Sequence, residues 1–374
     1  MSKPTIVTIV GTRPEIIRLS RVIARLDTLA NHFLIHTGQN SDPNLSDIFF
    51  SDLGIRKPDF YLEINTETLG TALGETLIKS EKILKNLKPN AVLVLGDTNS
   101  SISAVIAKRM NIPVYHMEAG NRSFDSNVPE EVNRKLVDHV SDFNLAYTEH
   151  ARRNLLAEGI QPRHILVTGS PIREIANFYR SKIEESKILE SLSLKPKEYF
   201  LVSAHRQENI DSEIRLKELV NTLGAIQEKY RVPVLVSTHP RIKNKIAEYK
   251  VDLPAGVIFH EPFGFLDYNK LQLNAKCVVS DSGTISEESI ILGFPAITIR
   301  DSIERPEALD AGGIVMTGLT SEEVLSGINF AINEFKDAKI EPPFEYMVDD
   351  FSRRVVSFVL STMSRHHEWF GIRK

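Results

Sequence analysis

Short hydrophobic runs rich in valine and isoleucine alternate along the chain with longer segments in which apolar residues recur at helical spacing. The short runs are typical of strands in a parallel sheet, and the longer segments are typical of the helices that cover both faces of such a sheet. The predicted strands are 5–10, 32–37, 91–95, 113–117, 143–147 and 165–168, and then 199–203, 232–237, 257–260, 277–280 and 296–299. The pattern therefore predicts an α/β protein with two Rossmann-like, doubly wound parallel sheets.

The length of 374 residues fits two domains better than one. We predict an N-terminal domain over 1–171 and a C-terminal domain over 172–350, with a cleft between them. The polar stretch 182–197 is the expected linker region. A last helix, near 351–363 in the tail 351–374, is predicted to pack back on the first domain.

The composition is that of a soluble globular protein, with 42% hydrophobic and 25% charged residues and a formal charge of only −4. The near-balanced charge argues against a nucleic-acid partner. No segment reaches the roughly 18 apolar residues of a membrane span, and the N-terminus lacks a signal-peptide pattern, so we expect a cytoplasmic protein that does not bind membranes. The single cysteine, Cys277, lies in a predicted strand and is expected to be a core residue.

Polar and charged residues follow nearly every predicted strand. Ligands of open parallel sheets bind at the carboxyl ends of the strands, so these positions are candidates for a binding site, although strand ends are also simply wetter than strand centres. They include Gly11 to Glu15, Asp97, His116, Glu118, His205, Arg206, His239, Glu261, Asp281 to Gly283, Arg300 and Asp301.

Two of these positions have the character of anion sites. Gly11-Thr12-Arg13-Pro14-Glu15 leads into a helix N-terminus, where free amides and Arg13 favour an anion. Asp281-Ser282-Gly283-Thr284 stands at the same kind of junction and can offer hydroxyls and amides to a diphosphate, or Ser282 can merely cap the helix. Of the two glutamates that follow, Glu287 and Glu288, one is expected to hold a ribose.

Three carboxylates of the first domain, Asp97, Glu118 and Glu130, are predicted to lie at strand ends and at a helix start. Neighbouring carboxylates separate their pKa values readily, which suits a pair of proton-transfer groups. For Glu130 and its neighbour Glu131, stabilisation of the helix dipole next to Pro129 is the competing explanation. No dinucleotide fingerprint, P-loop or metal-binding histidine pair is present, so we predict no cofactor and no metal.

The motifs taken together resemble a known family. They are Gly11-Thr12-Arg13-Pro14-Glu15, Gly96-Asp97-Thr98, Glu118-Ala119-Gly120, Pro129-Glu130-Glu131-x-Asn133-Arg134, Ala204-His205-Arg206-x-Glu208-Asn209, Asp281-Ser282-Gly283 and Glu304-Arg305-Pro306-Glu307. In this order, along nearly the whole chain, they are similar to the motifs of the non-hydrolysing UDP-N-acetylglucosamine 2-epimerases. The resemblance implies a GT-B-like fold of two Rossmann-like domains, a UDP-linked N-acetyl sugar as ligand, and a homodimer.

The resemblance also implies an elimination of UDP that leaves a 2-acetamidoglycal, followed by the return of UDP with protonation of carbon 2 on the other face. It makes Asp97, Glu118 and Glu130 the acid and base candidates and places His205 at the departing diphosphate. The residues that match nucleotide- or substrate-binding positions are Arg13, Arg134, Ser282, Gly283 and Glu288, and we add Arg18 and His239 to the substrate-binding candidates. Which carboxylate serves which face is left open.

The loop 120–128 departs from the glucosamine enzymes and looks like the branch that makes UDP-N-acetyl-L-fucosamine from UDP-2-acetamido-2,6-dideoxy-L-talose for capsule or O-antigen synthesis. Phe124 or Val128 would suit the methyl group of a 6-deoxy sugar. The segment 40–43 departs from the family's regulatory site, which puts activation by substrate in doubt. The alternatives are a UDP-N-acetylglucosamine to UDP-N-acetylmannosamine epimerase, a GT-B glycosyltransferase and a non-catalytic nucleotide-sugar sensor.

Overall fold

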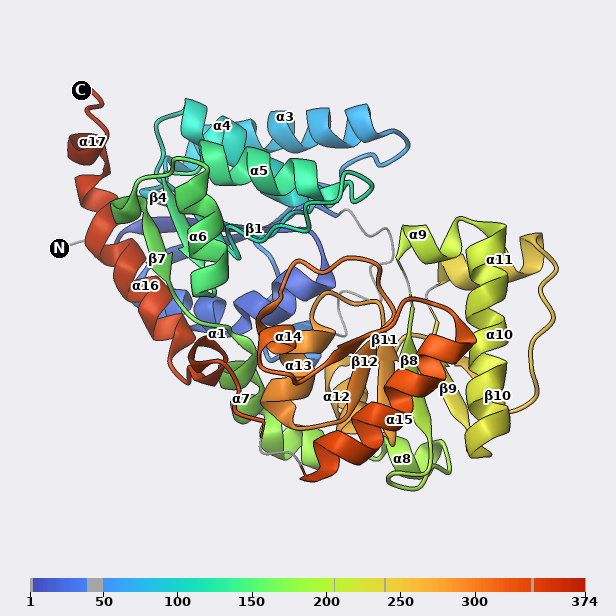
Figure 1. Ribbon diagram of the computed structural model, residues 1–374. Helices are drawn as coiled ribbons and strands as arrows, with labels where there is room; N and C mark the ends of the chain where they lie inside the picture. Colours follow the sequence, from blue (N-terminus) through green and yellow to red (C-terminus); the bar gives the residue numbers. More distant parts are fainter. Residues whose placement is uncertain (1–2, 39–49, 205, 239, 338–339, 374) are drawn as a thin grey trace. The chain divides into compact units, whose positions relative to one another are not determined.

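The computed structural model describes residues 3–38, 50–204, 206–238, 240–337 and 340–373. The chain forms two compact units, Met1–Asn177 with Phe344–Lys374 as unit 1, and Phe178–Pro343 as unit 2 (Figure 1). The division falls inside helix α7 (Ile172–Glu185) rather than in a linker. The polar stretch 182–197 contains the end of α7 and the short helix α8 (Ile188–Ser191), so its high charge reflects solvated helix surface.

Unit 1 is built on a parallel sheet whose described strands run in the order β3-β2-β1-β4-β5-β6-β7. The strands are β1 (Thr5–Val10), β2 (Asn31–His36), β3 (Phe60–Tyr61), β4 (Ala91–Leu95), β5 (Val114–Met117), β6 (Phe143–Ala146) and β7 (Ile165–Val167). Its helices are α1 (Arg13–Leu29), α3 (Leu69–Leu87), α4 (Ser103–Arg109), α5 (Glu130–Val140), α6 (Glu149–Ala157), α16 (Phe351–Thr362) and α17 (His366–Trp369). The central strand β4 is buried along its whole length, as its run Ala-Val-Leu-Val-Leu requires.

Unit 2 repeats this architecture with the strand order β10-β9-β8-β11-β12-β13, again all parallel. The strands are β8 (Phe200–Ser203), β9 (Val234–Ser237), β10 (Val257–His260), β11 (Cys277–Ser280), β12 (Ala296–Thr298) and β13 (Val315–Met316). Its helices are α8, α9 (Gln207–Ile210), α10 (Glu213–Tyr230), α11 (Pro240–Glu248), α12 (Phe265–Asn274), α13 (Ile285–Leu292), α14 (Glu307–Asp310) and α15 (Ser321–Asp337). The fold class predicted from the hydrophobic pattern is confirmed.

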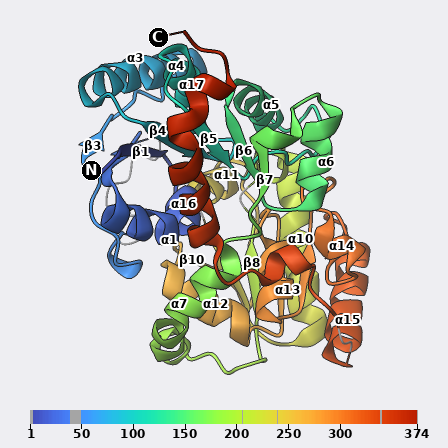
Figure 2. The same ribbon diagram turned by 90° about the vertical axis from the view of Figure 1, so that its left-hand side faces the viewer.

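The C-terminal helix α16 packs beside α1 of unit 1, which Figures 1 and 2 show from two sides. Arg25 Nε of α1 donates to Ser352 Oγ of α16 at 3.1 Å, and the buried hydroxyls of Tyr115 and Thr362 lie 2.7 Å apart. Residues 344–374 therefore complete the core of the first unit after the chain has built the second.

Cys277 is fully buried in β11, and burial raises the pKa of its thiol to about 12. The thiol is therefore protonated at neutral pH and behaves as a small core side chain. In the described part of the chain, none of the helices combines the length and hydropathy that a bilayer span requires.

Candidate active site

The end of β1 is tied to the end of β4 by the carboxylate of Glu15, whose role the sequence did not indicate. Glu15 is only 1% exposed and accepts hydrogen bonds from Gly11 N at 2.7 Å, Thr12 Oγ1 at 2.9 Å, Thr98 Oγ1 at 2.5 Å and Ser100 Oγ at 2.8 Å. Burial raises its pKa above the ordinary value, although these hydrogen bonds oppose the shift. Glu15 thus holds together the two loops that precede Arg13 and follow Asp97.

Arg13 is the first residue of α1 and is partly exposed. Thr12 precedes it in an extended conformation but makes no side-chain cap, because its hydroxyl donates to Glu15. The first-turn amides of α1 therefore lack a side-chain cap from Thr12 and retain the anion-attracting character expected of a helix N-terminus. Anion binding by Arg13 stays a prediction.

Asp97 follows β4 and is oriented by helix α5. Arg134 Nε donates a hydrogen bond to Asp97 Oδ2 at 2.7 Å, and Arg134 Nη2 lies 2.7 Å from the same oxygen. Asn133 Nδ2 also donates to the main-chain oxygen of Asp97 at 2.8 Å. Arg134 itself is buried. The predicted nucleotide-binding arginine therefore lies against a predicted acid/base residue, where it orients the carboxylate.

Glu118 follows β5 in an uncommon backbone conformation. Its φ of 64° lies in the left-handed region, which bulky L-residues rarely adopt and which recurs at functional sites. The side chain is 7% exposed and forms an ion pair with Arg18 of α1. Arg18, predicted to bind substrate, thus reaches the site through its contact with Glu118.

The two glutamates at the start of α5 have different environments. Glu131 is buried and accepts from Ser123 N and Oγ, both at 3.1 Å, and from Arg134 Nη1 at 2.9 Å. Burial would raise its pKa, but the hydrogen bonds from Ser123 and Arg134 outweigh it and lower the pKa. Glu130 is partly exposed, and within the described residues no hydrogen bond or ion pair occupies its carboxylate. Glu131 is therefore held by protein contacts, and the catalytic role of the more accessible Glu130 stays a prediction.

A buried charge network that sequence reasoning missed lies beneath Glu118. His116 Nδ1 is 2.8 Å from Asp138 Oδ1, and its Nε2 is 2.8 Å from the Gly96 oxygen. Arg122 donates to Asp138 at 2.8 Å and pairs with Glu158 at 2.6 Å. Asp138 lies in the last turn of α5, where only the helical period of buried positions would have pointed to it.

In unit 2, Asp281 organises the ends of β8 and β11. It is fully buried and its Oδ2 accepts from Arg206 N at 2.9 Å and Asn209 Nδ2 at 3.0 Å. Beyond it, the hydroxyls of Ser282 and Thr284 lie 2.9 Å apart just before α13, and Ser282 Oγ also accepts from Thr284 N at 3.4 Å. These hydroxyls remain near the N-terminus of α13, as a diphosphate site would need.

The carboxylate of Glu304 lies against the backbone of Gly283. A Cβ atom at Gly283 would lie 2.2 Å from Glu304 Oε1, and Arg305 Nη1 donates to the Gly283 oxygen at 2.6 Å. Glu304 is buried and pairs with Arg300 at 2.5 Å. The Glu304-Arg305 motif therefore supports the Ser282-Gly283 loop directly.

The structure separates the two ribose candidates. Glu287 is fully buried, with Arg305 Nε 3.8 Å from its Oε2. Glu288 is partly exposed and accepts from Gln272 Nε2 at 2.7 Å. Burial, together with the nearby charge of Glu288, raises the pKa of Tyr268. Glu288 is the glutamate of this pair that a ligand can reach.

His205, His239 and the segment 40–43 lie outside the described residues, so their predicted roles are unchanged. Among the described residues, no group of three histidine, cysteine, aspartate or glutamate side chains is arranged to hold a metal ion.

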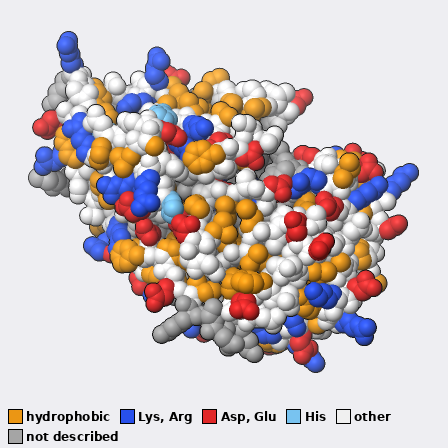
Figure 3. Space-filling model, in the orientation of Figure 1, with side chains coloured by type: hydrophobic (Ala, Val, Ile, Leu, Met, Phe, Trp, Pro, Cys, Tyr) orange, Lys and Arg blue, Asp and Glu red, His pale blue; other side chains and the backbone are white. Residues whose placement is uncertain are grey.

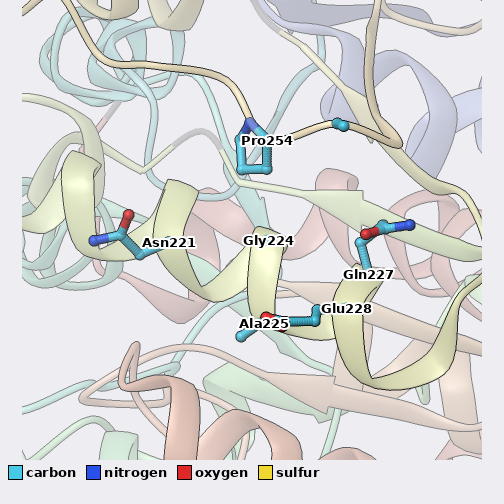
Figure 4. Close-up of a pocket in the computed structure, with 7 residues that line it drawn as sticks. Asn221, Gly224, Ala225, Gln227, Glu228 and Pro254 are labelled. Carbon is cyan, nitrogen blue, oxygen red and sulfur yellow. The ribbon is translucent and has the colours of Figure 1, made fainter.

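Unit 2 also has a surface hollow, whose lining residues Figure 4 shows. It is lined by Asn221, Gly224, Ala225, Gln227 and Glu228 of α10 and by Pro254 and Ala255. Pro254 and Ala255 directly precede β10, so the hollow belongs to the amino ends of the strands. Ligands of such sheets bind at the opposite edge, and we assign the hollow no role.

The sequence and the fold both match one known family. A family model described as UDP-N-acetylglucosamine 2-epimerase matches residues 25–360. The solved structure of a UDP-N-acetylglucosamine 2-epimerase from Rickettsia bellii is similar, with 42% identity, a TM-score of 0.91 and coverage of 98% of this chain and 100% of that one. A second similar structure is the Methanocaldococcus jannaschii UDP-GlcNAc 2-epimerase in complex with UDP-GlcNAc and UDP. It has 36% identity and a TM-score of 0.89, and the match covers 96% of this chain and 99% of that one. A UDP-2,3-diacetamido-2,3-dideoxy-D-glucuronate 2-epimerase from Pseudomonas aeruginosa is 35% identical over 88% of this chain and 92% of its own length.

Proposed function

The chain belongs to the UDP-N-acetylglucosamine 2-epimerase family of non-hydrolysing isomerases, and from this premise we propose that it inverts carbon 2 of a UDP-linked N-acetylhexosamine. UDP leaves carbon 1 as a proton leaves carbon 2, and UDP returns to the resulting 2-acetamidoglycal as a proton is added to the opposite face. The proton taken and the proton returned keep the reaction balanced without an oxidant, and no cofactor is needed.

The observation that carries the proposal is the arrangement of carboxylates in unit 1. Asp97 and Glu118 follow the adjacent strands β4 and β5, and each is held by an arginine from a different helix. Glu130 begins α5, the helix that supplies Arg134. Inversion at carbon 2 needs one group to accept a proton and another to donate one, and three carboxylates at one sheet edge can supply both.

Unit 2 supplies the proposed UDP site. The hydroxyls and amides of Ser282, Gly283 and Thr284 at the start of α13 would bind the diphosphate, and Glu288 would accept hydrogen bonds from the ribose. His205 and His239 are proposed to take part in the same site, and Arg13 of unit 1 stays a predicted UDP-binding residue. A glycosyltransferase would use a similar nucleotide site but would have no need for three carboxylates at the sugar.

For the substrate, we favour UDP-2-acetamido-2,6-dideoxy-L-talose, with UDP-N-acetyl-L-fucosamine as product. The support is the loop 120–128, where Phe124 is 76% exposed at a φ of 54° and Val128 is buried. An aromatic ring presented in this way suits the methyl group of a 6-deoxy sugar. The relatives carry names for more than one UDP-sugar, so the family alone does not fix the sugar. UDP-N-acetylglucosamine is the second candidate because two similar structures are named for it.

We extend the proposal to a cytoplasmic homodimer that serves capsule or O-antigen synthesis. The helices α3 and α5 expose apolar side chains, with Ile78 69% and Val132 71% accessible. Hydrophobic atoms are visible among charged ones on the face shown in Figure 3. A second copy of the chain covering α3 and α5 would remove these side chains from water.

The test is proton NMR in deuterium oxide with each of the two UDP-sugars in separate samples. We expect deuterium at carbon 2 of an epimeric product with the 6-deoxy sugar, and little reaction with UDP-N-acetylglucosamine. Reaction with the glucosamine substrate alone would move the assignment to the second candidate. Absence of exchange with both sugars, from a folded protein that binds UDP, would overturn the epimerase proposal.

A further inference from the structure

His116 links the two loops that carry Asp97 and Glu118. Gly96 lies directly before Asp97, and both its main-chain N–H and its carbonyl oxygen are hydrogen-bonded to residues of β5. Gly96 N donates to the Met117 oxygen at 2.9 Å, and His116 Nε2 lies 2.8 Å from the Gly96 oxygen. The main chain before Asp97 is therefore fixed to the two residues that precede Glu118.

Asp138 fixes the other side of Glu118. Its Oδ1 meets His116 Nδ1 at 2.8 Å, and its Oδ2 accepts from Gly120 N at 3.1 Å. His116 and Gly120 lie two residues before and two residues after Glu118. Gly120 has little freedom to move, because its φ is 84° and a Cβ atom there would lie 2.3 Å from the Ala151 oxygen. The left-handed turn at Glu118 is thus held at both ends.

The two ring nitrogens of His116 face a carboxylate oxygen of Asp138 and the main-chain oxygen of Gly96. The network joins His116 and Arg122 to the carboxylates of Asp138 and Glu158. All but Glu158 are buried, and His116 is 1% exposed. A histidine so enclosed does not reach a substrate.

We infer that His116 is a positioning residue that sets the spacing between the carboxylates of Asp97 and Glu118. The inference rests on the proposed function, because it assumes that both carboxylates act on the same sugar. A displacement of about 1 Å between reacting groups costs on the order of 100-fold in rate, so a residue that fixes this spacing acts on turnover more than on binding.

The experiment compares His116→Ala with His116→Gln, which can keep a donor toward Gly96, and His116→Asn, which can keep one toward Asp138. We expect the alanine variant to lose on the order of 100-fold in kcat, with KM and the UDP dissociation constant changed less than about two-fold. The two amide variants should retain more turnover than alanine. Equal losses in kcat and UDP affinity, or no advantage of the amides, would contradict positioning through hydrogen bonds.

His32 supplies the matched control. It is also buried, with Nδ1 2.6 Å from Asp27 and Nε2 2.9 Å from Thr8 Oγ1, but it lies at the amino end of β2. His32→Ala should lower Tm and leave kcat unchanged. Crystal structures of wild type and His116→Ala give a readout independent of activity. If Gly96 and Gly120 have the same positions in both structures, the inference is overturned. If the wild-type enzyme exchanges no proton at carbon 2, the result counts instead against the proposed function.

Discussion

Arg134 directs two guanidinium nitrogens, Nε and Nη2, at one oxygen of Asp97, each 2.7 Å away. Its third nitrogen, Nη1, bonds Glu131, which in turn holds the backbone of Ser123. The loop in which the sequence departs from the glucosamine enzymes is therefore joined, through one glutamate and one arginine, to a proposed acid/base residue.

Replacing Arg134 by lysine should reduce kcat by about 10- to 100-fold, because an ammonium group cannot reproduce the planar, multi-nitrogen contact with Asp97 and Glu131. UDP affinity, measured by titration calorimetry, should change little. Arg109→Lys, at an exposed arginine of α4, is the matched control and should be neutral. A loss of UDP affinity as large as the loss of turnover would instead place Arg134 at the nucleotide, as its sequence motif suggests.

Arg18 and Glu118 should be energetically coupled. Both side chains are buried and they form an ion pair, so Arg18→Met leaves a buried carboxylate without this cation. Breaking such a pair costs about 3–5 kcal/mol. The double variant Arg18→Met/Glu118→Gln should be more stable than Arg18→Met alone, since the uncompensated charge is gone. Urea unfolding of the four proteins in this cycle measures the coupling, and additive losses would show that the pair contributes nothing specific.

The fold could be predicted from the sequence because strands such as β1 and β4 are continuous apolar runs, which only a buried parallel sheet accommodates. The strands β3 and β13 were missed because each has only two residues and carries no pattern of its own. The hydrophobic pattern also could not show that the boundary between the two units falls inside α7. A helix that serves two units has the same periodicity as one that serves a single unit.

From the sequence, residues of the candidate site could be predicted only where they directly follow a strand. The sequence singled out Asp97 and Glu118 by their place after β4 and β5, but it gave no reason to join Asp97 to Arg134 or Glu118 to Arg18. Those pairs depend on the rotation of α1 and α5 about their axes, which tertiary packing sets. Asp138 looked like an ordinary helix residue, and only its burial and its hydrogen bonds to His116 and Gly120 show that it organises the turn around Glu118.

Glu15 should make stability depend on pH. Its pKa in the folded protein is raised by burial above the ordinary 4.5, so the protonated form is the better fit to the fold. The stability that Glu15 contributes is therefore fully present below about pH 4.5 and is lost as pH rises through the raised pKa. Glu15→Gln cannot titrate, so its deficit in unfolding free energy relative to wild type should be larger at acidic than at alkaline pH.

The measurement for Glu15 is urea unfolding of wild type and Glu15→Gln at several pH values, compared as differences so that the other titrating groups cancel. Glu67→Gln, at an exposed position, is the control and should show no such trend. A deficit for Glu15→Gln that is constant with pH would mean that the carboxylate does not change its protonation in this range.

Gly283→Ala should weaken UDP binding. The added methyl group would lie 2.2 Å from Glu304 Oε1, so the end of this buried side chain must shift, which disturbs its contacts with Arg206 and Arg300. The loop that presents Ser282 would then lose its support, and we expect UDP affinity to fall by about 10-fold or more, or about 1.4 kcal/mol. Gly74→Ala in α3 is the matched control, since no atom lies within 4 Å of its added methyl group.

Comparing the two glycine variants shows whether the loop at Gly283 binds the nucleotide or only contributes to packing. If Gly283 matters only for packing against Glu304, its alanine variant will lower Tm and leave the UDP affinity of the remaining folded protein unchanged. If the loop binds the diphosphate, affinity will fall in folded protein under conditions where Gly74→Ala binds normally. Because Glu304 carries charge into this contact, the loss should also persist in high salt, which screens exposed charges far more than buried ones. A loss that vanishes in salt would point to a surface effect and away from the Ser282–Gly283 loop.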